Sequence, residues 1–246
     1  MGKVITVASG KGGTGKTTSC AAISSCLAVL GYKTLCIDFD AGLKNLDLSL
    51  CMTEFTIKDY MDVLSGHLPL MEACSESPLI AHLFFIAAPT VLDRGKPDKA
   101  RLTTMFEEVR REFDFCLIDA PSGIGTGFSL AHTCADMSII VTTGELPAMR
   151  DAQRAATAAR DAGVKELRLL VNRVNPNNFK RIQATVDDVI DTVNVRLLGI
   201  IPEDKNVFRS LHANIPLILY NKRLAAYDYL DAARRIIGEE VPLRQR

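Results

Sequence analysis

The chain has 246 residues, of which 48% are hydrophobic and 24% are charged, a composition typical of a globular protein. Its 29 basic and 29 acidic residues give a formal net charge of zero, so overall charge does not support nucleic acid or an anionic membrane as a partner. No apolar run approaches the roughly eighteen residues of a membrane-spanning helix, and residue 3 already opens a strand-like segment where a signal peptide would stand. We therefore expect a cytoplasmic protein whose residues 1–246 form a single domain.

Short apolar segments alternate with helical segments along the whole chain. Strands are expected at residues 3–8, 34–38, 83–87, 115–119, 137–142, 167–171 and 195–201. Helices are expected at residues 17–30, 101–112, 148–162, 182–192 and 223–237. Continuously apolar strands joined by helices are typical of a parallel sheet that is covered on both faces. The predicted fold class is therefore a wound α/β domain with a mostly parallel sheet, in which ligands bind at the carboxyl ends of the strands.

A glycine-rich segment, Ser-Gly-Lys-Gly-Gly-Thr-Gly-Lys-Thr-Thr at residues 9–18, joins the first strand to the first helix. Its Gly-x4-Gly-Lys-Thr spacing arises by accident in roughly one per cent of chains of this length. In such a loop the backbone N–H groups surround phosphate at the positive end of the following helix. Lys16 reaches the β- and γ-phosphates, and the Thr17 hydroxyl binds Mg²⁺. The predicted nucleotide-binding residues are Gly10, Lys11, Gly12, Gly13, Thr14, Gly15, Lys16, Thr17 and Thr18.

Lys11 has two interpretations, because phosphate binding within one subunit does not need a second lysine in the loop. It is either a solvated loop residue or a charge supplied to the nucleotide of a neighbouring subunit, in the manner of an arginine finger. Spacing alone does not decide between them.

Carboxylates follow two of the expected strands. Asp119 ends the strand at 115–119, where a Walker B aspartate holds Mg²⁺. Asp38 ends the second strand and Asp40 follows it closely. The predicted metal ligands are Thr17, Asp38 and Asp119.

Four segments resemble the MinD/ParA family of deviant Walker A P-loop ATPases, and they occur in the family's order. They are residues 11–18, 37–47, 117–123 and 199–204. The second and fourth are similar to the MinD type in particular, and the Asp-Pro-Gln that usually follows the second strand in ParA proteins is absent. A MinD-type ATPase helps to place the bacterial division septum. The resemblance therefore implies a Mg-ATP-dependent dimerisation switch.

The resemblance also implies roles for single residues. Lys11 corresponds to the signature lysine that crosses a face-to-face ATP dimer, and Asp40 to the switch I residue that positions the attacking water. An aspartate is a weak base at neutral pH, so we expect slow hydrolysis of ATP to ADP and phosphate until a partner completes the site. Residues 121–127 correspond to switch II, which orders with ATP and relaxes after hydrolysis. The adenine contacts implied are Asn172, Arg173, Pro202, Glu203 and Asp204, with Arg173 stacking on the base.

Two segments depart from the MinD pattern. Residues 143–151 resemble the part that faces the partner subunit, but Gly144 and Leu146-Pro147 are unusual there, and a solvated helix start is an equal interpretation. Residues 239–246 contain two acids and a proline, so they cannot form the amphipathic helix with which MinD proteins usually lie on a membrane. A peripheral position at the inner membrane face is therefore doubtful.

The expected partners are a second copy of the chain and protein regulators of the division site. Nucleic acid is an unlikely partner, although Lys180, Arg181, Arg234 and Arg235 could form a basic patch. The alternatives left open are a related ATPase that positions flagella, pili or DNA, a small-molecule ligase or kinase, and a scaffold that binds ATP without cleaving it.

Overall fold

The computed structural model describes residues 1–40, 45–53, 58–89, 97–177 and 185–244. The strands in these residues form one eight-stranded sheet. Its strand order is β3-β4-β2-β5-β1-β6-β7-β8. The paired strands run parallel to one another, except that β3 is antiparallel to β4. The strands are β1 (Lys3–Ala8), β2 (Thr34–Asp38), β3 (Ser75–Glu76), β4 (Leu83–Ile86), β5 (Phe115–Asp119), β6 (Met137–Thr142), β7 (Glu166–Val174) and β8 (Leu197–Pro202).

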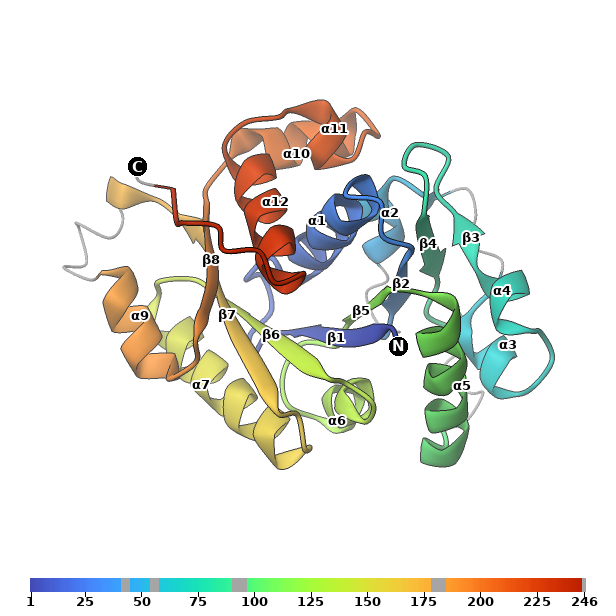
Figure 1. Cartoon of the computed structure of the whole chain (residues 1–246). Helices are drawn as coiled ribbons and strands as arrows, with labels where there is room; N and C mark the ends of the chain where they lie inside the picture. The colour runs from blue at the N-terminus through green and yellow to red at the C-terminus, as the bar shows by residue number, and fades with distance from the viewer. Residues whose placement is uncertain (41–44, 54–57, 90–96, 178–184, 245–246) are drawn as a thin grey trace.

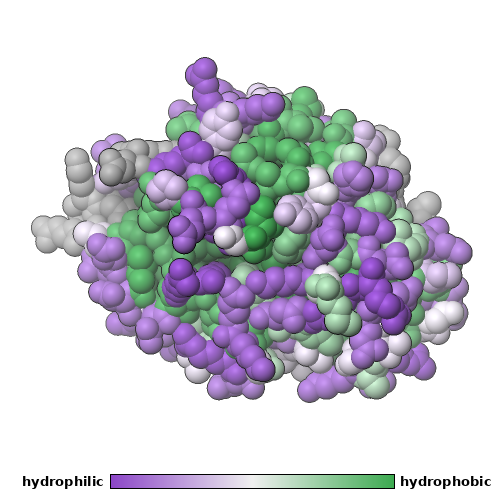
Figure 2. Space-filling view, in the orientation of Figure 1, coloured by the Kyte–Doolittle hydropathy of each residue, from purple (hydrophilic) through white to green (hydrophobic). Residues whose placement is uncertain are grey.

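Helices cover both faces of the sheet (Figure 1). The upper layer in this view contains α1 (Lys16–Val29), α2 (Leu46–Leu50), α10 (Lys205–His212), α11 (Leu217–Tyr220) and α12 (Ala225–Ile236). The other helices are α3 (Tyr60–Leu64), α4 (Leu70–Ala73), α5 (Lys99–Glu112), α6 (Thr126–His132), α7 (Leu146–Asp161) and α9 (Val186–Val193). Hydrophilic side chains cover the outer surfaces of α5 and α7, as expected for helices that bury only one side (Figure 2).

The wound α/β prediction is confirmed, with corrections to single elements. All seven expected strands are present within a few residues, whereas the two-residue β3 was missed because so short a strand has no periodicity to detect. The short helices α2, α3, α4, α6, α10 and α11 were also missed. Residues 121–127, the predicted switch II segment, end in the first turn of α6, which begins at Thr126. The expected helix at 182–192 is observed from Val186, and residues 182–184 lie outside the described part.

Two hydrophobic clusters form the core, one on each side of the sheet. Side chains alternate along β1, so that Ile5 and Val7 pack against the α1 side while Val4 and Ala8 pack on the other. Helix α1 is buried almost all round, because its many serine, alanine and cysteine side chains are small enough to let it touch the sheet, α2 and α12 together. The glycine-rich loop is therefore attached to a rigid, central helix.

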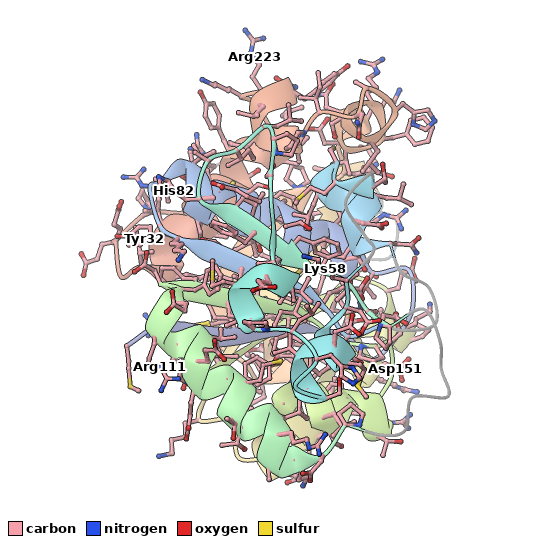
Figure 3. The ribbon with its side chains drawn as sticks, turned by 90° about the vertical axis from the view of Figure 1, so that its right-hand side faces the viewer. Tyr32, Lys58, His82, Arg111, Asp151 and Arg223 are labelled. Carbon is pink, nitrogen blue, oxygen red and sulfur yellow. The ribbon has the colours of Figure 1, made fainter. Side chains whose placement is uncertain are left out.

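The carboxyl ends of the parallel strands lie together at one edge of the sheet. In Figure 3, Tyr32 and His82, which lie within two residues of the starts of β2 and β4, are on one side of the molecule, and Asp151 in the first half of α7 is on the other. This second side carries the ends of β1, β2 and β5, and hence the predicted phosphate and metal residues.

The C-terminal part of the chain folds back on α12. Residues 239–244 are not helical; the Arg235 guanidinium holds them by donating to the backbone oxygens of Val241 and Pro242, at 2.9 Å each. Within the described residues, no helix combines the length and the apolar character needed to cross a membrane.

Candidate nucleotide-binding site

The glycine-rich loop leaves β1 at Ala8 and enters α1 at Lys16, one residue before the predicted helix start. Gly13 and Gly15 have φ angles of +82° and +89°, which side chains other than glycine adopt only with strain. Gly10 has a different reason to be glycine, because a Cβ there would lie 2.1 Å from the Asp151 carbonyl oxygen of α7. The loop is thus fixed by its own turns and by α7.

A cavity of about 180 Å³ lies inside the loop and is lined by six of the nine predicted loop residues and by Asp40 and Asp119. Ser9, Asn45 and Ser122 were not predicted as nucleotide contacts, although all three lie in or beside the motifs. The lining residues are Ser9, Gly12, Gly13, Gly15, Lys16, Thr17, Thr18, Asp40, Asn45, Asp119 and Ser122.

Lys16, Thr17 and Asp119 form the polar centre of this cavity. The Lys16 ammonium donates to one Asp119 oxygen at 2.7 Å, and the Thr17 hydroxyl donates to the other at 2.7 Å. The side chains of Lys16 and Asp119 are only 5% and 2% exposed, so the ion pair is held away from water. A lysine, a hydroxyl and a carboxylate at the start of a helix suit a phosphate chain and a Mg²⁺ ion, which prefers oxygen ligands. The Thr14 hydroxyl adds a buried polar atom that has no hydrogen-bond partner among the described residues.

Asp38 and Asp119 are direct neighbours in the register of β2 and β5. Burial and the nearby Asp119 carboxylate raise the pKa of Asp38 to about 7. Burial likewise raises the pKa of Asp119, while the Lys16 ammonium and the Thr17 hydroxyl oppose that rise. A cation placed between two such carboxylates would stabilise their ionised forms, so the pair suits a metal ion.

Asp40 lies at the rim of the same cavity. Its backbone N–H donates to Asp38 Oδ1 at 2.8 Å, so the chain bends directly after β2. The residues that follow in the predicted switch I segment, Ala41, Gly42, Leu43 and Lys44, lie outside the described residues.

A second, larger cavity of about 690 Å³ adjoins the loop and shares Gly15 and Thr18 with the first. All five predicted adenine contacts line it: Asn172, Arg173, Pro202, Glu203 and Asp204. The space is large enough for a nucleoside next to the phosphate cavity.

Asn172 also supports the loop. Its side chain is buried, donates to the Thr14 carbonyl at 2.8 Å, and would be 2.2 Å from a Cβ on Gly15. Its oxygen accepts from the Arg173 backbone N–H at 2.9 Å, and this contact holds Arg173 at a φ of +54°. The Arg173 guanidinium then reaches the Gly13 carbonyl at 3.3 Å.

Asp204 also has a structural contact. Its carboxylate accepts from the Asn206 N–H at 2.9 Å and so caps α10, and it accepts from the Ala225 N–H at 3.3 Å at the start of α12. The loop that lines the cavity is therefore tied to both C-terminal helices.

Comparison with known proteins agrees with this geometry. Residues 5–217 match the family model of the CobQ/CobB/MinD/ParA nucleotide binding domain. The septum site-determining protein MinD of Bacillus subtilis is 34% identical over 247 residues, an alignment that covers 99% of this chain and 92% of the relative. The chain belongs to the MinD family.

Solved MinD structures have the same fold. The MinC:MinD cell division protein complex of Aquifex aeolicus aligns with a TM-score of 0.90 and 33% identity, covering 99% of this chain and 98% of that one. MinD of Pyrococcus horikoshii, solved as a complex with Mg-ADP, aligns with a TM-score of 0.86 and 27% identity, covering 97% of each chain. The MinD-type resemblance seen in the sequence is confirmed.

The segment expected to face a partner subunit lies beside the loop in this MinD-family chain. The Lys11 ammonium is 3.5 Å from Glu145 Oε2, and the two side chains are 44% and 69% exposed. Such an exposed pair is weak, worth at most about 1 kcal/mol. Lys11 is therefore at the surface next to the start of α7.

Some residues of the site carried no sequence signal. Tyr229 of α12 is buried and lines the larger cavity; its hydroxyl lies 3.1 Å from Ser19 Oγ and donates to Asn172 Oδ1 at 3.4 Å. Only folding reveals this contact, since Tyr229 is 210 residues from Ser19. Of the predicted basic patch, Lys180 and Arg181 lie outside the described residues, while Arg234 pairs with Glu239 and Arg235 holds the C-terminal segment.

Proposed function

We propose that this chain is a MinD-like ATPase that hydrolyses ATP to ADP and phosphate and acts in placing the division septum. The observation that supports the proposal most directly is the Lys16–Asp119–Thr17 group inside a glycine loop at the start of α1. The similarity to septum site-determining proteins along nearly the whole chain supports the cellular role.

The residues present fit Mg²⁺ and a triphosphate. In the proposal, loop N–H groups and Lys16 bind the phosphates, and Thr17, Asp119 and Asp38 hold Mg²⁺, which when bound neutralises charge on the transferred phosphoryl group. Asp40, at the cavity rim, orients the attacking water. Asn172 and Tyr229 keep the loop in shape from behind, since both bond to the loop or to α1.

We further propose that two subunits associate face to face with ATP between them, and that Lys11 reaches the partner's phosphates. Its exposure beside the start of α7 supports this role. The similar Aquifex aeolicus structure is a complex of MinC with MinD, and we infer a protein partner of this kind for the present chain.

The test is phosphate release by the purified protein with Mg-ATP. Lys16→Ala should lower the rate by at least about 100-fold, because a preorganised charge at the phosphates is lost. Lys33→Ala is the matched control: Lys33 pairs with Glu112 at 3.7 Å, and it directly precedes β2, at the opposite edge of the sheet from the loop. Equal rates for Lys16→Ala and the wild type, with both proteins folded by circular dichroism, would contradict the proposal.

A further inference from the structure

One side of helix α10 lines the larger cavity, although its Val207 also packs against the hydrophobic core on the α1 side of the sheet. Ser210 is its one buried residue. Val207, Phe208 and Leu211 lie on one side of the helix and line the cavity beside the loop, together with the N-cap residue Asp204. An apolar surface next to a phosphate-binding loop is suited to a ligand that carries a flat apolar group in addition to its phosphates.

Phe208 is the most exposed residue of this side. Its relative exposure is 63%, although a phenylalanine carries the largest apolar area of the cavity residues on α10. Its ring centroid lies 4.0 Å from that of His212, one helical turn away. This contact restricts the rotation of the phenyl ring, so little conformational freedom would be lost when a ligand covers it.

The planar guanidinium group of Arg173, on strand β7, also lines the cavity. It is directed to the Gly13 carbonyl. A guanidinium and an aromatic ring are the two kinds of side chain that stack on nucleobases. Because Gly15 and Thr18 border both cavities, a ligand with phosphates in the loop would place its base in this space.

Helix α10 contacts both of the neighbouring C-terminal helices. Asp204 ties its start to α12, and its body contacts α11, with which it lies at the top of the molecule in Figure 3.

We propose that Phe208 is the base-stacking residue of the nucleotide site and that it sets the affinity for the purine. This inference rests on the proposed nucleotide binding and goes beyond it, because it assigns base recognition to α10. Stacking of one base on an aromatic ring corresponds to roughly a 5- to 150-fold change in affinity.

The experiment compares the dissociation constants of Mg-ATP and Mg-tripolyphosphate, measured by calorimetry on the full chain. Phe208→Ala should raise the constant for ATP about tenfold and leave the constant for tripolyphosphate, which has no base, within about twofold. Phe208→Tyr should restore the affinity for ATP. Leu219→Ala is the control, because Leu219 is a 42% exposed apolar residue of α11 that does not line the cavity.

Two results would overturn the role of Phe208: an unchanged constant for ATP in Phe208→Ala, or equal weakening of both ligands. Failure of the proposed function looks different. In that case the wild type binds neither ligand, or Lys16→Ala binds both as tightly as the wild type.

Discussion

The buried polar side chains of this protein divide into those that suit a ligand and those that hold the fold. Asp119 and Lys16 belong to the first group, since their ion pair sits inside the cavity of the loop. His132 belongs to the second. It is 1% exposed, and its two ring nitrogens lie 2.7 Å from the Phe128 carbonyl and 2.9 Å from the Ser138 hydroxyl.

Because of His132, we expect the free energy of unfolding to fall in mild acid. Burial lowers the pKa of His132 to about 4, against about 6.5 in the unfolded chain. The unfolded state therefore binds a proton at a higher pH than the folded state, and stability present above pH 6.5 is lost as the pH falls towards 4. Between pH 7.5 and pH 5 this group alone should lower the free energy of unfolding by about 2 kcal/mol.

Urea unfolding at the two pH values measures this effect. His132→Gln has no proton to gain, so its free energy of unfolding should change with pH by about 2 kcal/mol less than that of the wild type. An identical pH dependence in both proteins would show that His132 is not the titrating group.

At the scale of elements, the C-terminal segment and α12 stabilise each other through charge. The Arg244 guanidinium lies 2.6 Å from Asp231 Oδ2, 3.7 Å from Asp228 Oδ1 and 5.0 Å from the centre of the Tyr227 ring. The Asp231 side chain is only 4% exposed, and its Oδ1 has no hydrogen-bond partner within the described residues. A buried carboxylate on α12 thus depends on an arginine beyond the end of the helix.

Arg244→Ala should lower the free energy of unfolding by about 2 kcal/mol, because it removes the cation that is hydrogen-bonded to the buried Asp231 carboxylate. Arg234→Ala is the matched control: its ion pair with Glu239 is also 2.6 Å long, but both side chains are about 40% exposed. That change should cost less than about 1 kcal/mol.

A double-mutant cycle separates charge from packing in this pair. In an Asp231→Asn background, Arg244→Ala should cost much less than in the wild type. Equal costs in both backgrounds would assign the effect to lost packing on Tyr227 instead.

At the scale of the whole molecule, the sheet brings Lys11, Lys16 and Asp40 to one face, and their proposed roles in a dimer can be separated. Light scattering coupled to size exclusion measures the mass in Mg-ATP, which should rise from 26.9 kDa for one chain to twice that value. Asp40→Ala should still form the dimer in Mg-ATP. Without Asp40 the bound ATP is hydrolysed too slowly for hydrolysis to dissociate the two subunits. Lys11→Ala should bind ATP and stay monomeric.

Glu145→Ala is the control for this experiment. It removes the 3.5 Å pair with Lys11 but leaves the lysine itself, so the dimer should form as in the wild type. A stable Lys11→Ala dimer with normal hydrolysis would contradict the role of Lys11 across the interface.

The sequence by itself determined the parts of this protein that depend on contiguous residues. Glycines at 10, 12, 13 and 15 followed by Lys16 and Thr17 specify a phosphate-binding loop, in which Gly13 and Gly15 have φ angles above zero, and apolar runs of strand length specify a parallel sheet. The position of Asp119 near the loop could also be predicted, because the carboxyl ends of parallel strands lie at one edge of the sheet.

Only the tertiary structure decided what packs behind and beside that loop. Asn172 supports Thr14 from 158 residues away, and Tyr229 reaches Ser19 from the last helix. Phe208 faces a cavity, and Arg244 returns to Asp231, although neither residue stands in a motif. The physical reason is that such contacts depend on which helix faces meet across the sheet, and no periodicity within a single element carries that information.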